Sequence, residues 1–242
     1  MAMARARPRF LAAGDAGLVV EFGESIDRQT SARVLALQAR IAGAGLPGIV
    51  ELVPTFRSLL VHLDPDATDL AAAEAAISLL VGDLDIAEMP SRHWTIPVCY
   101  EPAFAPDIDA VAERTGLGRS QVVEAHSGRE YHVYMIGFVP GYPYMGDLAR
   151  ELVLPRREDP RLRVPPGSVA IATTLTAIYP IESPGGWHIV GRTPVRLFDP
   201  ERDPPALLRP GDKVRFSPIP GERFAEIAET GDGGTQAAGR TP

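Results

Sequence analysis

The feature that most constrains the fold is a series of short β-type segments separated by proline and glycine, between His126 and Pro194. From Tyr131 the chain alternates aromatic or branched residues, as a β-strand does. The next ten residues, Gly137–Gly146, contain two prolines and three glycines, which impose tight turns. Short strands punctuated in this way predict a β-barrel or β-sandwich. The aromatic loop suits a pocket wall, although core hairpins have this composition too.

A second proline- and glycine-rich run lies further along, and it contains Ser183-Pro184-Gly185-Gly186. Proline followed by glycine is typical of a type II turn between two strands. Such a turn would place Glu182 and Trp187 on either side of one hairpin. An acid, an indole and glycine amides close together are suited to a small polar ligand, and short polar hairpins also occur without one.

The first part of the chain predicts a mixed α+β domain over residues 1–90. Strands are expected within 9–22, at 49–53 and at 58–63, and helices around Val34–Ile41 and at 70–81. Ser25 or Asp27 is expected to cap the first helix and Thr68 the second. With a strand at 94–100 the order is β-α-β-β-α-β, the split-βαβ, ferredoxin-like pattern, although this last strand could equally begin the second domain. Residues 91–228 then form the β-barrel domain, and the polar, glycine-rich residues 229–242 a disordered tail.

Composition excludes several kinds of function. The net charge of −7 does not favour nucleic-acid binding, and no apolar run reaches the ~18 residues of a membrane span. Residues 1–9 lack the apolar stretch of a secretory signal, so a cytoplasmic protein is expected. Cys99 is the only cysteine and lies in an apolar run, which favours buried packing. Lys213 is the only lysine and no P-loop motif occurs, so no cofactor is expected on this chain and any ATP would be used by a partner protein.

Several long motifs, all in one order, resemble a single family. They comprise Gly137–Tyr144, Pro155–Arg157, Arg163–Val169, Ile178–Trp187 and Gly191–Pro194, within a resemblance that extends from about Arg9 to Ile219. The family is the B subunit of the bacterial ATP-dependent 5-oxoprolinase, also described as allophanate hydrolase subunit 1 or the KipI family. The resemblance implies a cyclophilin-like barrel. It also implies one member of a complex that opens 5-oxo-L-proline to L-glutamate, together with the C subunit of the enzyme (allophanate hydrolase subunit 2) and an ATP-handling subunit.

Two side chains are candidate catalytic groups. Glu182 stands beside the proline-glycine turn and could act as a general base, with the Gly185 and Gly186 amides stabilising an oxyanion. His126, near the end of a predicted helix that favours a cation, matches a histidine associated with the family. Candidate substrate-binding residues are Arg163, Tyr144, Thr174, Gly185, Gly186, Trp187 and Arg192. No set of ligands predicts a metal site.

Most arginines of the segment 156–163 are expected to be solvated, with Arg163 as the exception because it adjoins a family motif. The segment Thr173–Ala177 departs from the family, where a Gly-Gly-Gln-Thr-Gly type of run is expected. Leu175 cannot replace the hydrogen bonds of glutamine, and a change of substrate or a loss of activity would follow if this loop touches substrate.

Two other functions remain open from the sequence. One is hydrolysis of allophanate or another small carboxylated amide. The other is a protein-binding module without catalysis, since some members of the family are described as inhibitors of a sporulation histidine kinase. Proline-rich loops with exposed aromatic residues suit protein recognition as well as substrate binding.

Overall fold

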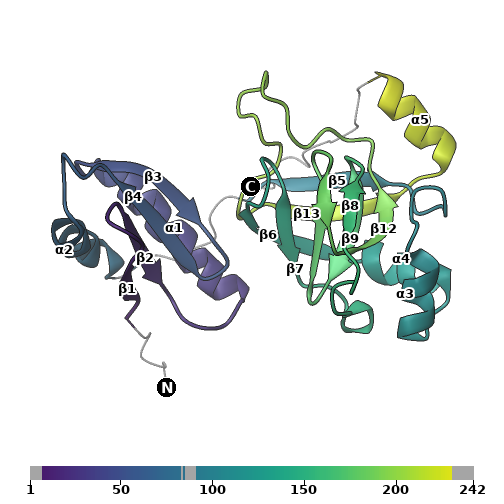
Figure 1. Ribbon diagram of the computed structural model, residues 1–242, viewed down its shortest axis with the longest axis horizontal. Coiled ribbons are helices and arrows are strands. Elements are labelled where there is room, and N and C mark those ends of the chain that lie inside the picture. Colours follow the sequence, from purple (N-terminus) through teal and green to yellow (C-terminus); the bar gives the residue numbers. More distant parts are fainter. Residues whose placement is uncertain (1–6, 83, 85–90, 231–242) are drawn as a thin grey trace, which may run out of the picture. The chain divides into compact units, whose positions relative to one another are not determined.

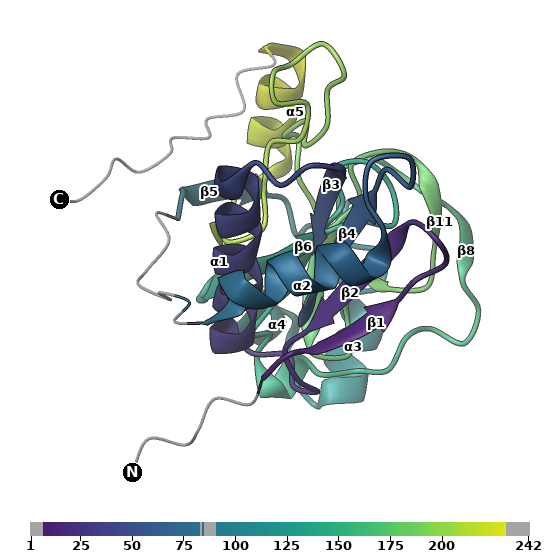
Figure 2. The same ribbon diagram turned by 90° about the vertical axis from the view of Figure 1, so that its left-hand side faces the viewer.

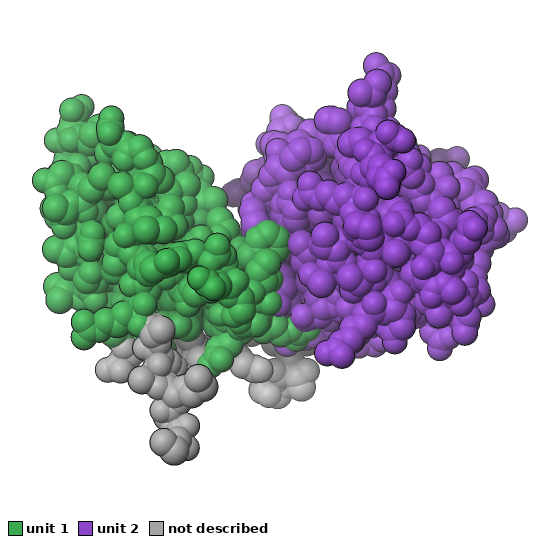
Figure 3. All heavy atoms as spheres, turned by 60° about the horizontal axis from the view of Figure 1, so that its bottom comes forward, with its two compact units in different colours: residues 1–90 green, residues 91–242 purple. Residues whose placement is uncertain are grey.

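A computed structural model describes residues 7–82, 84 and 91–230, and the chain divides into two compact units. The first unit is Met1–Pro90 and the second is Ser91–Pro242, coloured separately in Figure 3. Each unit has its own hydrophobic core. Leu18, Val20, Leu37 and Leu59 lie in the core of the first unit, and Ile96, Tyr131, Ile171 and Phe216 in that of the second.

The first unit is a four-stranded antiparallel sheet with two helices. Its elements are β1 (Arg9–Ala12), β2 (Gly17–Glu21), α1 (Arg28–Ala44), β3 (Ile49–Pro54), β4 (Ser58–Leu63) and α2 (Leu70–Val81). The strand order is β1-β2-β4-β3. Figure 2 shows α1 and α2 in front of the same face of this sheet, where their apolar residues join one core.

The two predicted helices are confirmed, and their caps can be assigned. Val34, Leu37 and Ile41 of α1 are buried, and the Asp27 carboxylate accepts a hydrogen bond from the Thr30 backbone N–H at 2.8 Å. The predicted Thr68 cap of α2 is wrong, because Asp69 is the capping residue and accepts from the Ala72 N–H at 2.8 Å. Both Asp and Thr favour this position, and only the chain geometry decides between adjacent candidates.

The ferredoxin-like pattern is not confirmed for this unit. Strand β4 lies between β2 and β3, as a split βαβ arrangement requires, but the outer place beside β2 is taken by β1. The strand expected to follow α2 is β5 (His93–Val98), which pairs in parallel with β13 (Lys213–Pro218) of the second unit. Sequence order alone could not assign β5, since its partner lies far along the chain.

The second unit is built on a nearly closed seven-stranded sheet, as Figure 1 shows. The sheet order is β12-β9-β10-β7-β6-β13-β5. The remaining strands of the sheet are β6 (Glu130–Ile136), β7 (Pro143–Gly146), β9 (Ser168–Ala172), β10 (Leu175–Ile178) and β12 (His188–Arg192). The two edges meet where Cys99 and Arg192 exchange backbone hydrogen bonds of 2.8 and 2.9 Å. The barrel-like part of the prediction is therefore confirmed.

Helices lie at both ends of the barrel. Helices α3 (Ile108–Thr115) and α4 (Arg119–Ser127) lie at one end, and α5 (Gly221–Thr230) projects at the other (Figure 1). A single 3-10 turn, η1 (Arg150–Leu152), follows β7. Glu229 and Thr230, expected at the start of a disordered tail, are the last residues of α5, and residues 231–242 lie outside the described residues.

The predicted Ser-Pro-Gly-Gly turn is wrong. Ser183–Gly185 is a short strand, β11, which pairs with β8 (Arg161–Val164) in a separate two-stranded sheet. Proline is compatible with such a strand because an edge position does not need its missing N–H. The local composition is typical of a turn, and only the pairing with β8, distant in the sequence, makes it a strand.

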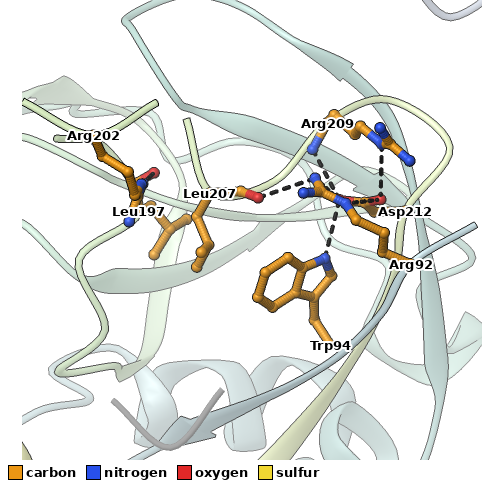
Figure 4. A network of polar contacts seen from close by, with 7 residues as sticks. All are labelled: Arg92, Trp94, Leu197, Arg202, Leu207, Arg209 and Asp212. Atoms are coloured by element: carbon orange, nitrogen blue, oxygen red, sulfur yellow. Dashed lines mark hydrogen bonds and ion pairs between the residues drawn. The ribbon is translucent and has the colours of Figure 1, made fainter. Parts of the chain in front are cut away.

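The buried carboxylate of Asp212 connects the start of the barrel to the loop that precedes β13, as Figure 4 shows. Both oxygens of Asp212 accept hydrogen bonds from Arg92, at 2.6 and 3.0 Å, and Trp94 donates its indole N–H at 3.0 Å. The backbone N–H of Arg209 also donates to Asp212, at 3.0 Å. In the same loop, Arg202 donates to the carbonyl oxygen of Leu197. These contacts satisfy a charge that would otherwise destabilise the fold.

Candidate functional site

One cavity of the second unit brings together two of the predicted site residues, Glu182 and Arg192. Its volume is about 610 Å³, within the usual range for small-molecule sites. The remaining lining is mostly apolar and consists of Pro166, Gly167, Pro180, Ile181, Thr193, Pro194, Val195, Arg196, Phe198, Pro200, Phe224 and Ala228. An apolar cavity with a few charged groups is the usual form of a small-molecule site.

Arg192 is held at this cavity by three contacts. Its backbone closes the barrel against Cys99, its Nε donates to the Pro166 carbonyl at 2.9 Å, and its guanidinium carbon lies 5.9 Å from the centre of the Phe224 ring. Within the described residues, no hydrogen bond or ion pair engages the two Nη nitrogens. The outer part of the guanidinium is therefore available to a ligand.

The carbonyl that holds Arg192 belongs to a rigid turn. Gly167 has φ +80°, and a Cβ at this position would lie 2.2 Å from the carbonyl oxygen of Thr193. Only glycine fits such a close approach at positive φ. The Gly167 N–H donates to the Tyr179 carbonyl at 2.7 Å, and its carbonyl accepts from the Thr193 N–H at 2.9 Å. The Pro166 oxygen is thus fixed by the neighbouring strands.

Glu182 lines the cavity with little constraint on its side chain. It follows Pro180 and Ile181 and directly precedes β11. Its nearest cation is Arg163, with 3.6 Å between Nε and Oε1, and the two side chains are 82% and 56% exposed. Such an exposed pair contributes little stability, so Glu182 is free to exchange Arg163 for another partner.

The predicted binding residues Tyr144 and Trp187 lie in an aromatic cluster under β8 and β11. Tyr142 packs edge-on against Tyr144, Tyr179 and Trp187, with ring centres 4.9, 5.0 and 6.2 Å apart. Trp187 is 6% exposed, and Tyr144 is half-buried. Burial raises the pKa of the Tyr142, Tyr144 and Tyr179 hydroxyls, which therefore stay neutral. Neither Tyr144 nor Trp187 lines the cavity.

Gly185 and Gly186 lie between this cluster and the segment 155–163. A Cβ on Gly185 would lie 2.2 Å from the Tyr179 hydroxyl oxygen, so β11 packs directly on that ring. Gly186 accepts a hydrogen bond from the Arg157 N–H at 2.8 Å. Both glycines therefore have structural contacts of their own, and neither lines the cavity.

Thr174 lies in the exposed turn between β9 and β10. The preceding residue, Thr173, has φ +52°, and the Thr174 carbonyl accepts a hydrogen bond from the Leu148 N–H at 3.3 Å. The turn does not contribute to the cavity wall. The departure from the family motif at Thr173–Ala177 thus falls on this turn and on the first three residues of β10, and none of the five residues lines the cavity.

His126 is completely buried in the barrel core. Thr176 donates its hydroxyl to the Ala170 carbonyl at 3.1 Å, so it accepts from His126 Nε2 at 2.9 Å. The other nitrogen, Nδ1, then accepts from the Tyr100 hydroxyl at 2.8 Å. Burial lowers the pKa of His126 to about 3, which makes the expected cation at the helix end wrong. His126 is part of α4, stacks on Phe216, and does not line the cavity.

A carboxylate that the sequence did not single out, Asp107, organises the arginine segment. Arg161 donates to its two oxygens at 2.7 and 2.8 Å, Arg157 donates at 2.9 Å, and the Ile189 N–H donates at 2.7 Å. Asp107 is 4% exposed. The expectation of solvated arginines is wrong for Arg157 and Arg161, which tie this segment to the barrel. Asp107 directly precedes α3, a position where aspartate often caps a helix, but its side chain makes no capping hydrogen bond and binds the arginines instead.

Phe224 is the other residue that the sequence did not identify. It lies on α5, where Phe224, Ile227 and Ala228 recur at helical spacing. This spacing was the available signal for a helix that packs on the barrel. Within the described residues, no group of three or more metal-ligating side chains occurs, and no helix is long and apolar enough to cross a membrane.

The fold and site define a carboxyltransferase-type domain. The family described as carboxyltransferase domain, subdomain C and D, matches residues 8–208. The chain is 41% identical to the B subunit of 5-oxoprolinase from Escherichia coli O157:H7, over 88% of this chain and 96% of that protein. It is 38% identical to the B subunit of 5-oxoprolinase from Bacillus subtilis, over 84% and 89%. The chain therefore belongs to the family of 5-oxoprolinase B subunits, which confirms the resemblance seen in the sequence.

Solved structures show how the same domain occurs in longer chains. The crystal structure of TTHA0988 matches with a TM-score of 0.76 and 37% identity, over 86% of this chain but only 40% of that one. The urea amidolyase of K. lactis has the same fold, with a TM-score of 0.76 and 24% identity, over 94% of this chain and 16% of that one. The present chain thus spans a minor part of both.

Proposed function

We propose that this chain is the non-ATP-binding subunit of an ATP-dependent 5-oxoprolinase complex, which hydrolyses 5-oxo-L-proline to L-glutamate. The observation that carries the proposal is the 41% identity to a protein named as the B subunit of 5-oxoprolinase, sustained over nearly the whole of both chains. The cavity supports it, since a cation and a carboxylate in an apolar lining suit a small amide that carries a carboxyl group.

Glu182 is the candidate general base of this reaction. Ring opening adds water to the lactam carbonyl, breaks the C–N bond and transfers a proton to the nitrogen. A carboxylate at the cavity can take the proton from the attacking water and return it to the leaving nitrogen. Among the described residues, Glu182 is the only carboxylate that lines the cavity, and its weak pairing with Arg163 leaves it accessible. His126 has no access to this cavity from the barrel core, so we assign it a structural role.

Two partners complete the proposed complex: a homologue of the C subunit (allophanate hydrolase subunit 2) and an ATP-handling subunit. The relatives named as B subunits, which the chain matches over 89% and 96% of their length, support an assembly with other subunits. The described lining of the cavity also supplies only part of a catalytic set, with one carboxylate and no histidine or cysteine. ATP dependence favours a cytoplasmic complex.

The proposal also includes the type of barrel and the domain boundaries. A nearly closed seven-stranded sheet supports a cyclophilin-like barrel over residues 91–228, as a domain separate from residues 1–90. The site would then reside wholly in the second unit, to which every residue that lines the cavity belongs.

A related amide is the alternative substrate. More distant relatives, such as urea amidolyase of Saccharomyces cerevisiae at 25% identity over 92% of this chain, are named for other amide chemistry. Allophanate also combines an amide with a carboxylate, and it would use the same two charged side chains.

Reconstitution tests the proposal. This chain is co-expressed with the C-subunit homologue, purified, and combined with the ATP-handling subunit, and ATP hydrolysis is measured with and without 5-oxo-L-proline. We expect ATP hydrolysis that depends on 5-oxo-L-proline and disappears when this chain is omitted. A stable complex that responds to allophanate but not to 5-oxo-L-proline would select the alternative substrate. A chain that forms no complex, and whose omission changes nothing, would overturn the proposal.

A further inference from the structure

The outer wall of the cavity is formed by a helix beyond the region that the carboxyltransferase family matches. That region ends at residue 208, whereas Phe224 and Ala228 of α5 line the cavity. Helix α5 projects from the end of the barrel opposite α3 and α4 (Figure 1). The shape of the cavity therefore depends on where this helix is held.

Two contacts hold α5 beside the cavity. The carboxylate of Glu101 accepts a hydrogen bond from the Gly221 N–H at 2.9 Å, at the start of the helix, where a negative charge is favourable. The Phe224 ring packs on Phe104, with 4.5 Å between ring centres. Phe224 thus contacts the Glu101–Ala105 turn through Phe104 and contacts Arg192 directly.

These contacts also determine where the Arg192 guanidinium points. Its Nε is occupied by the fixed Pro166 carbonyl, and its carbon lies 5.9 Å from the Phe224 ring centre. A planar guanidinium held by its Nε and beside an aromatic ring presents both Nη nitrogens in one direction. That fork matches the two oxygens of a carboxylate. Arg196, the other arginine of the cavity, already pairs with Asp199 at 3.1 Å.

We propose that this end of the cavity is a carboxylate subsite, in which Arg192 binds the carboxyl group of a small amide and Phe224 positions Arg192. The inference rests on the proposed function and names the part of the substrate that the site recognises. Arg192 is a binding residue that touches the ligand, and Phe224 is a positioning residue that acts through Arg192. Glu182, on the same cavity, is left to face the amide group.

The test compares a substrate with its neutral analogue. In the reconstituted complex, kcat/KM is measured for 5-oxo-L-proline and for 5-oxo-L-prolinamide, which replaces the carboxylate by a carboxamide. A charge-assisted pair with Arg192 predicts that wild type prefers the acid by about 10- to 100-fold. Arg192→Gln should raise KM for the acid by a similar factor and bring the preference close to one. Arg192→Lys, which keeps the charge but loses the fork, should give an intermediate preference.

Phe224→Leu tests the positioning role. KM for 5-oxo-L-proline should rise by about threefold to tenfold, while KM for the amide changes little, because only the acid uses Arg192. The matched control is Arg223→Gln on the same helix, whose side chain is 57% exposed and pairs with Glu226. It should leave the acid/amide preference unchanged. A purely structural effect of Phe224 would raise both KM values together, and that result would overturn its positioning role.

A second probe separates this inference from the proposed function. Binding of N-acetylglycine and N-acetylglycinamide to the full chain is measured by calorimetry. A preference for the acid that Arg192→Gln abolishes would support the subsite even if the complex does not turn over 5-oxo-L-proline. The complex could instead turn over 5-oxo-L-proline while wild type and a folded Arg192→Gln variant show the same acid/amide preference. That result would overturn the subsite and leave the proposed function intact.

Discussion

Asp107 and Arg161 form a bidentate ion pair, with nitrogen–oxygen distances of 2.7 and 2.8 Å, between the start of α3 and strand β8. Arg157 and the Ile189 backbone N–H complete the set of donors to Asp107. This arrangement fixes the segment 155–163 and strand β8 with it. Since β8 pairs with β11, the contact also supports the chain that directly follows Glu182.

Asp107→Asn should destabilise the second unit. The substitution removes the charge that two partly buried arginines share, and breaking such a buried pair leaves unpaired charge behind. We expect the free energy of unfolding to fall by about 2–4 kcal/mol, measured by urea denaturation. Asp109→Asn is the matched control, because Asp109 is 69% exposed and pairs with Arg119, so its loss should cost less than about 1 kcal/mol. Equal effects of the two substitutions would contradict the assigned role of Asp107.

The low pKa of His126 predicts that the stability of the protein depends on pH. Burial lowers this pKa to about 3, from the ordinary value of 6.5, so between these two values only the unfolded chain binds the proton. The contribution of His126 to stability is complete above pH 6.5 and is lost as pH falls toward 3. Within this window the slope is about 1.4 kcal/mol per pH unit for one proton.

The slope is measured by urea denaturation of wild type and His126→Gln between pH 6 and pH 4.5. We expect the stability of wild type to fall more steeply, by up to about 1.4 kcal/mol per unit, because the variant lacks this titrating group. Carboxylates that titrate in the same range contribute equally to both proteins and cancel in the difference. Parallel curves, or an NMR titration of His126 centred near 6.5, would show that the imidazole is accessible to water.

Gly185 makes a steric prediction for strand β11. A Cβ there would lie 2.2 Å from the Tyr179 hydroxyl, so Gly185→Ala must displace either the strand or the ring. We expect a loss of about 1–3 kcal/mol in the free energy of unfolding, as for other overpacked sites. In Gly186→Ala the nearest atoms of Pro160 are 3.7 Å away, and this control should be tolerated. A Gly185→Ala protein as stable as Gly186→Ala would mean that β11 does not pack closely on Tyr179.

Local patterns predicted the parts of the fold that local forces determine. Helices α1 and α2 were predicted from their apolar residues, although the cap of α2 was assigned to Thr68 instead of Asp69, and the alternation after Tyr131 predicted strand β6. Strand pairing could not be predicted in the same way. The placement of β5 beside β13, and of Ser183–Gly185 beside β8, depends on segments far away in the chain.

Some of the site residues could be predicted from local motifs, and others depend on contacts between distant segments. Glu182 and Arg192 were predicted from motifs, and the fold brings both to one cavity. Trp187 and Tyr144 belong to the same motifs, but they pack in the aromatic cluster instead. Phe224 and Asp107 were not predicted from the sequence. Phe224 contacts Arg192, and Asp107 pairs with Arg157 and Arg161. Both sets of contacts join segments that are far apart in the chain and meet only in the folded barrel.

The most direct test of the proposed function is the rate of L-glutamate formation by the reconstituted complex with Glu182→Gln. Glu158→Gln is the matched control, an exposed glutamate that lies outside the cavity. Loss of a general base predicts a fall in kcat of about 100-fold or more for Glu182→Gln, with complex assembly intact and Glu158→Gln unaffected. Wild-type glutamate formation by the Glu182→Gln complex would contradict the assignment of Glu182 as the catalytic base.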